Sequence, residues 1–107
     1  MLVSTSNEIA GYRIVQHLGV VRGITVRSRS VVGNFVGGIA AIFGGRIQVY
    51  VTLAENARQE AFDHMVEHAG QGGANAIIAM RYDATEIMAG ITEVLCYGTA
   101  VRVEPLN

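Results

Sequence analysis

Apolar and polar residues alternate from Tyr12 to Val26. One face of this stretch carries the apolar residues Tyr12, Ile14, Leu18, Val20, Ile24 and Val26. A period of two is typical of a β-strand with one buried face. Gly19 and Gly23 fall on the other face, where glycine inside a strand indicates a bulge or a bend. We therefore predict one long, bent strand or a hairpin, buried on its apolar face. The polar residues before it, 1–11, are expected to form a turn or entry segment.

A helical pattern begins at Thr52. Thr52 and Glu55 have the spacing of a capping box, whose side chains satisfy free backbone amides at a helix start. Glycines from Gly70 onward supply the geometry that ends a helix. Residues 47–53 alternate and, by period alone, read as a short strand before the helix. The apolar half of the helical wheel holds Ala54, Ala57, Ala61, Phe62, Met65, Val66 and Ala69.

Two further strands are predicted after the helix. Residues 76–82 are nearly all apolar until Arg81, which is the pattern of a strand buried on both faces. Residues 83–90 are polar and mixed and are expected to be a connection. The last strand, 91–103, is apolar on both faces, which in a small domain indicates a helix on one side and another subunit on the other. Its two faces are Leu95, Tyr97, Val101 and Val103, and Val94, Cys96, Gly98 and Ala100.

Residues 31–45 are apolar and glycine-rich, and Gly33 and Gly37 have the GxxxG spacing of membrane helices. As a helix these residues would span only about 22 Å, which is shorter than the roughly 30 Å hydrocarbon core of a bilayer. The stretch also contains Asn34 and five glycines. We predict a packed helix or an interface segment and no transmembrane segment, with contact to a lipid surface as the alternative.

Composition narrows the functional classes. Half of the 107 residues are hydrophobic and 16% are charged, which is more apolar than a small solvated monomer needs, so we expect one domain, 1–107, that self-associates. The formal charge of −1 provides no basic field for nucleic acid. The chain contains no lysine, which excludes Schiff-base chemistry and a phosphate-binding lysine loop. A single cysteine and the lack of a charged and then apolar leader favour the cytoplasm.

The predicted helix carries a candidate metal motif. His64, Glu67 and His68 match H-x-x-E-H, the zinc-peptidase pattern in which two histidines bind metal and the glutamate acts as base. Histidines four residues apart lie on one helix face, so both rings can reach one ion. A catalytic zinc needs a third protein ligand, far downstream in those peptidases, and only 39 residues follow His68. We assign no catalytic residues and retain the three as metal-ligand candidates, with surface histidines as the alternative.

Five other side chains carry expectations. Cys96 lies in a strand and is expected to be inert packing. His17 could join a metal cluster only if the fold brought it near. Arg58 falls in the apolar half of the helix, where a charge needs a partner. We expect Asp83, or a carboxylate of a neighbouring subunit, to pair with it, and we group Arg58, Arg81 and Asp83 as structural ion-pair candidates.

Short motifs follow one another along the chain in a characteristic order and spacing: Gly11-Tyr12, Leu18 to Gly23, Gly44-Gly45, Tyr50, Ala57-Arg58, Gly73 to Ala76, Arg81 to Asp83 and Gly98 to Val101. In this order the chain resembles the YbjQ family of small bacterial and archaeal proteins, which carry a heavy-metal-binding label. The resemblance covers almost the whole chain and implies an α+β fold. The implied unit is a two-layer β-α-β-β arrangement, an antiparallel sheet covered by a helix, with extra short elements that join five subunits in a ring. It also implies that the helix starts nearer Tyr50 than Thr52.

Three functional hypotheses follow. The first is a cytoplasmic binding or scaffold protein that assembles as a homo-oligomer, a pentamer. Its ligand is unknown, and a divalent or heavy-metal ion is one candidate. The second is a metal-dependent hydrolase that uses His64, Glu67 and His68. The third is an interaction protein at a membrane surface, through residues 31–45. We expect a binding or scaffold protein rather than an enzyme, with no nucleic-acid partner.

Overall fold

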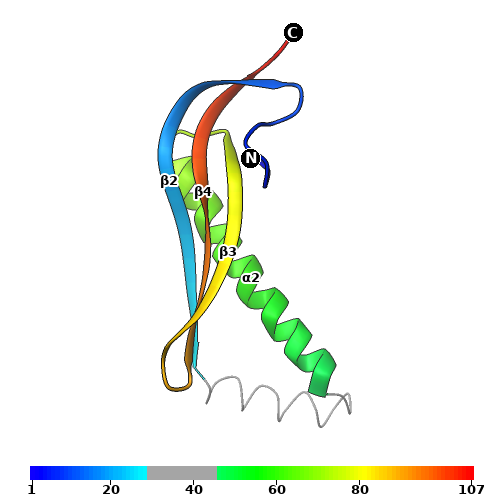
Figure 1. Ribbon diagram of the computed structural model, residues 1–107, viewed down its shortest axis with the longest axis vertical. Coiled ribbons are helices and arrows are strands. Elements are labelled where there is room, and N and C mark those ends of the chain that lie inside the picture. The colour runs from blue at the N-terminus through cyan, green and yellow to red at the C-terminus, as the bar shows by residue number, and fades with distance from the viewer. Residues whose placement is uncertain (29–45) are drawn as a thin grey trace.

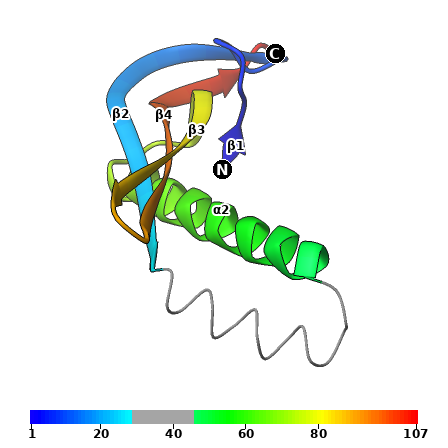
Figure 2. The same ribbon diagram turned by 60° about the horizontal axis from the view of Figure 1, so that its bottom comes forward.

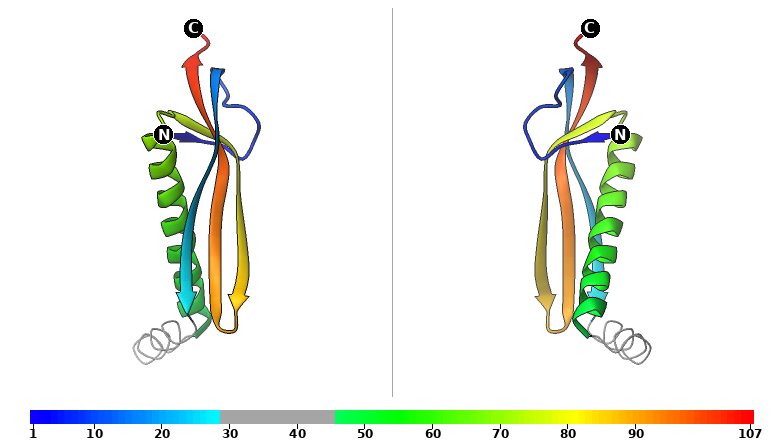
Figure 3. Two further views of the ribbon diagram at one scale, coloured as in Figure 1. Left: turned by 90° about the vertical axis from the view of Figure 1, so that its left-hand side faces the viewer. Right: turned by 90° about the vertical axis from the view of Figure 1, so that its right-hand side faces the viewer.

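A four-stranded sheet with one helix across it makes up the described part of the chain, residues 1–28 and 46–107 of the computed structural model. The strands lie in the order β1-β3-β4-β2, and α2 covers one face of the sheet (Figure 1, Figure 3). The predicted α+β fold is confirmed. The expectations for residues 31–45 lie outside the described residues. The elements are β1 (Leu2–Val3), β2 (Tyr12–Ser28), α2 (Arg46–Gln71), β3 (Ala76–Met88) and β4 (Ile91–Pro105).

The sheet is mixed and not purely antiparallel, which corrects the prediction. β2 and β3 both pair antiparallel with β4, whereas β1 pairs parallel with the start of β3 (Figure 2). The backbone amide of Ser4 donates to the carbonyl of Ile77 at 2.9 Å and extends this contact. A two-residue strand is too short to show a period, so the sequence pattern indicated only a turn.

The helix begins earlier than its predicted capping box. α2 starts at Arg46, so residues 47–53 are helical and the predicted short strand is wrong. The Thr52 hydroxyl donates to the carbonyl oxygen of Gln48, one turn earlier, at 3.0 Å. Thr52 therefore lies inside the helix and is not its cap. Alternation over so few residues does not separate a strand from the start of an amphipathic helix.

The hairpin between β3 and β4 is longer and tighter than predicted. β3 continues to Met88, so most of the predicted connection is strand, and Gly90 adopts a positive φ of 78° in the turn. β1 pairs only with the first residues of β3, which leaves the outer half of β3 at the edge of the sheet. Edge strands carry polar residues. Residues 83–88 are therefore polar and mixed although they form a strand, and this composition alone indicated a connection.

The main core lies between α2 and the sheet. A Cβ atom on Gly23 would overlap the carbonyl oxygen of Ala61 and the amide nitrogen of Met65, so helix and strand touch at this point. A smaller cluster lies on the opposite face, at the far end of the sheet, where Ile9 covers it. The buried members of the main core are Val21, Ala61, Met65, Ala69, Ile77, Met80, Cys96 and Ala100.

The predicted buried face of β2 is wrong in its central part. Val20 and Val26 are 73% and 50% exposed, whereas Val21 and Thr25 are buried beneath α2. Gly19, with a φ of 105°, adjoins one of two register shifts in β2, and this confirms the predicted bulge. The period of two separated the faces correctly, but it did not indicate which face the helix covers.

Candidate functional site

The candidate metal residues lie beside β2. His64, Glu67 and His68 line a shallow groove of about 370 Å³ between α2 and β2, together with Arg22. The Cβ atom of His64 is only 2.8 Å from the place where a Cβ on Gly23 would be. The close approach of helix and strand at this glycine therefore places both histidines against the backbone of β2.

The His68 ring is held by the backbone of Arg22. Its Nδ1 atom lies 3.2 Å from the Arg22 amide nitrogen and 3.3 Å from the Arg22 carbonyl oxygen. In one tautomer Nδ1 accepts from the amide, and in the other its N–H donates to the carbonyl. The second tautomer leaves the lone pair of Nε2 free, as in metal-binding histidines whose other nitrogen is anchored by a carbonyl.

The groove does not assemble a catalytic zinc set. Glu67 accepts a long hydrogen bond of 3.4 Å from Gln71. Within residues 1–28 and 46–107 no three His, Cys, Asp or Glu side chains are grouped so that they could hold a metal ion. His17 lies elsewhere on β2, opposite Val101 of β4, and does not line the groove. The hydrolase hypothesis therefore gains no support.

A polar network that the sequence analysis missed joins β2 to α2. The Thr25 hydroxyl donates to Glu60 at 3.0 Å, and the Arg27 guanidinium donates to both Thr25 and Glu60. These hydrogen bonds, that from Arg27 first, hold the pKa of Glu60 below its ordinary value of 4.5. The only sequence signal was a threonine between apolar residues of a strand, which is too common to identify a network.

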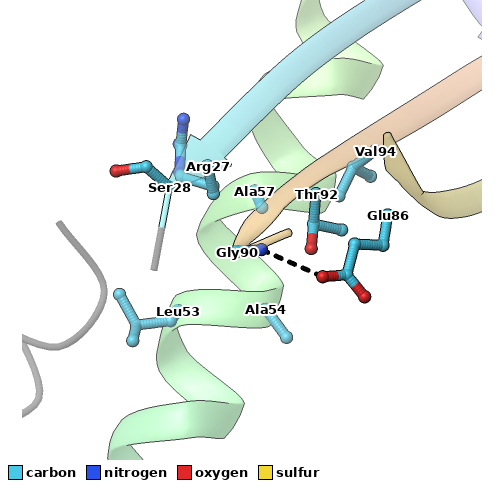
Figure 4. A pocket seen from close by; sticks show the side chains of 9 residues that line it. All are labelled: Arg27, Ser28, Leu53, Ala54, Ala57, Glu86, Gly90, Thr92 and Val94. Carbon is cyan, nitrogen blue, oxygen red and sulfur yellow. Dashed lines mark hydrogen bonds between the residues drawn. The ribbon is translucent and has the colours of Figure 1, made fainter. Parts of the chain in front are cut away.

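A second hollow, of about 340 Å³, adjoins this network (Figure 4). Ala54 and Ala57 of α2 face Thr92 and Val94 of β4 across it, as Figure 4 shows. On its rim a Glu86 oxygen accepts from the amide of Gly90 at 2.9 Å. The lining is mostly apolar and presents no arrangement of nucleophile and base.

The structural ion-pair candidates make other contacts within the chain. The Arg58 guanidinium lies over the Tyr82 ring, 5.1 Å from its centre. Arg81 donates to the carbonyl oxygens of Thr5 and Met80, both at 2.8 Å. Asp83 accepts from the following backbone amide at 2.9 Å. The ion pairs in the described ranges are Arg13–Glu104 and Arg27–Glu60, so pairing with a neighbouring subunit stays a prediction.

The single cysteine is a core residue. Cys96 is fully buried, and its thiol donates to the Met65 sulfur at 3.6 Å. Burial raises the pKa of this thiol. A protonated, inaccessible thiol is a poor nucleophile and a poor metal ligand.

Sequence comparisons with known proteins identify the family, and a structural comparison shows the shared fold. The family model described as "Putative heavy-metal-binding" matches residues 1–104. A UPF0145 protein of Chromobacterium violaceum is 61% identical, over 98% of this chain and 90% of its own. One of Burkholderia thailandensis is 58% identical, over 94% and 91%. A solved structure of a Pediococcus pentosaceus protein of unknown function shares the fold, with a TM-score of 0.62 and 17% identity over 97% of this chain and 98% of that chain. The chain belongs to the YbjQ family, whose members include the UPF0145 proteins.

Proposed function

We propose that the protein is a homo-oligomeric, cytoplasmic binding or scaffold protein. The observation that supports this is the sheet face opposite α2. Val20, Ile24 and Val26 are 73%, 40% and 50% exposed there, and Tyr97 of β4 is 37% exposed on the same face. Exposed apolar side chains gathered on one face of a sheet mark an interaction site in small proteins.

A second copy of the chain is the expected occupant, because this face carries both signs of charge among its apolar residues. Residues that lie side by side on neighbouring strands form rows across the sheet, and a row with cationic side chains lies next to rows with anionic ones. Such a surface can complement its own copy. The rows across β2, β4 and β3 are Arg22, Tyr97 and Arg81; then Ile24, Leu95 and Asp83; then Val26, Glu93 and Thr85.

Free strand edges support the same proposal. β2 pairs only with β4 in the described part of the chain, and from Tyr82 onward β3 also has β4 alone beside it. The backbone of Arg22 in β2 contacts His68 instead, but long strand edges of this kind are otherwise sites for pairing with another chain. The number five comes from the family resemblance, and the heavy-metal ligand class comes from the description of the family. α2, the helix that the structure describes, lacks the length of apolar sequence needed to cross a bilayer.

Light scattering and native mass measurement at micromolar concentration test the assembly. We expect five times the 11.4 kDa chain mass. Ile24→Asp should lower this mass, because it places a charge in an apolar interface. Leu106→Asp, at a 62% exposed position near the carboxyl end, is the control and should leave the mass unchanged. A wild-type protein that runs at 11.4 kDa refutes the proposal.

A further inference from the structure

The two histidines of α2 are arranged as a chelating pair. They are four residues apart, so their Cβ atoms lie about 5–6 Å apart on one helix face. Nitrogen atoms of imidazole rings bind zinc at about 2.0–2.1 Å, and two rings at this spacing can both reach one ion at that distance. His64 and His68 are both exposed and both line the groove against β2. The described residues provide His64 with no hydrogen-bond partner, so its ring is free to turn toward an ion.

The backbone of β2 orients one of the two rings. When the Nδ1–H of His68 donates to the Arg22 carbonyl, 3.3 Å away, Nε2 carries the free lone pair of the ring and is available to an ion. This anchor reduces the rotational freedom that the ring would lose on binding an ion. The geometry therefore differs from that of two unrelated surface histidines, neither of which would be tied to a carbonyl.

A carboxylate lies beside the pair. Glu67 is adjacent in sequence to His68 and also lines the groove. Its one described hydrogen bond, from Gln71, is 3.4 Å long and is readily exchanged. A negative charge at this position attracts a divalent cation, whereas Glu60 is already occupied by Arg27 and Thr25.

We propose that His64 and His68 together bind one first-row divalent ion per chain, with Cu²⁺ bound more tightly than Ni²⁺ or Zn²⁺. Imidazole suits these three ions, and the usual order of divalent affinities places copper highest. Water completes the coordination. Thiophilic ions such as Hg²⁺ and Cd²⁺ are disfavoured at this site, because the chain's single thiol, Cys96, is buried in the core.

Calorimetric titration of the untagged full chain with Cu²⁺ and with Ni²⁺, in a weakly chelating buffer, tests this site. We expect one ion per chain. His64→Ala and His68→Ala should each raise the Kd at least tenfold, since a chelate becomes a single ligand. His17→Ala removes the third histidine, which lies outside the groove, and should change the Kd less than twofold. Electron paramagnetic resonance of the Cu²⁺ form should show two nitrogen ligands, and one after His64→Ala.

Either of two results overturns the proposal: no saturable binding below 100-fold molar excess, or a His64→Ala variant that binds like the wild type. His64 makes no described hydrogen bond, so its variant should fold, and circular dichroism checks this. The inference gives a site and a metal class to the binding role proposed above, but it does not depend on the number of subunits. Light scattering on the same samples separates the two, because a pentamer without metal binding refutes only the site, and a metal-binding monomer refutes only the assembly.

Discussion

Replacing Gly23 with alanine tests the contact that positions the helix. The added methyl group would overlap the Ala61 carbonyl oxygen and the Met65 amide nitrogen, and it would lie 2.8 Å from the His64 Cβ. Two of these atoms belong to the backbone of a single stretch of α2, so no side-chain rotation can relieve the overlap. The helix as a whole must move away from β2.

The expected cost follows from the packing that this movement loses. Overfilling a packed core costs about 1–3 kcal/mol. A radial gap of about 0.5–1 Å also forfeits a quarter to a half of each dispersion contact, and Met65 and Ala61, both 0% exposed, lie at this point. Alanine recovers roughly 0.5–1 kcal/mol because it is less flexible than glycine when unfolded. We expect a net loss of about 2 kcal/mol, or roughly 10 °C in Tm for a domain of this size.

Urea unfolding followed by circular dichroism, at one fixed protein concentration, measures this loss. Gly70→Ala is the matched control, because a Cβ there meets nothing within 4 Å. Since Gly70 lies in the last turn of α2, the control should lose no stability and should gain at most about 1 kcal/mol. A Gly23→Ala variant as stable as the wild type would show that helix and strand are not in contact at this glycine.

Three further outcomes are expected. Arg27 lowers the pKa of Glu60, so the ionised carboxylate stabilises the fold above its ordinary pKa of 4.5. This stability disappears as the pH falls through the lowered pKa. In Glu60→Gln, the urea midpoints of unfolding at pH 7 and pH 3 should therefore differ less than in the wild type. Ala79 has a φ of 54°, a conformation that costs alanine about 1–2 kcal/mol. Ala79→Gly should therefore raise the thermal midpoint by a few degrees, after the glycine entropy cost of roughly 0.5–1 kcal/mol; a lower midpoint contradicts this. Cys96 should react with a thiol reagent only as fast as the protein opens, because it is fully buried; fast labelling without urea contradicts this.

The sequence by itself determined where β2, β4 and the first half of β3 lie and where the helix ends. Alternation located β2, runs apolar on both faces located β4 and the start of β3, and the glycines from Gly70 onward marked where α2 stops, because these signals depend on neighbouring residues. The capping-box spacing of Thr52 and Glu55 predicted a helix start that is too late, since the same residues also fit a helix interior. The histidine pair was visible from its spacing, but its anchor at Arg22 was not.

Only the tertiary structure decided which side of each strand is covered. Alternation shows that a strand has two different faces, but the covered face depends on where a distant segment packs. Here α2 packs on the face that contains Gly23, because a residue without a side chain admits the helix backbone at Ala61. The larger apolar residues Val20, Ile24 and Val26 were left on the open face. That contact joins residues far apart in the chain, and no local pattern records it.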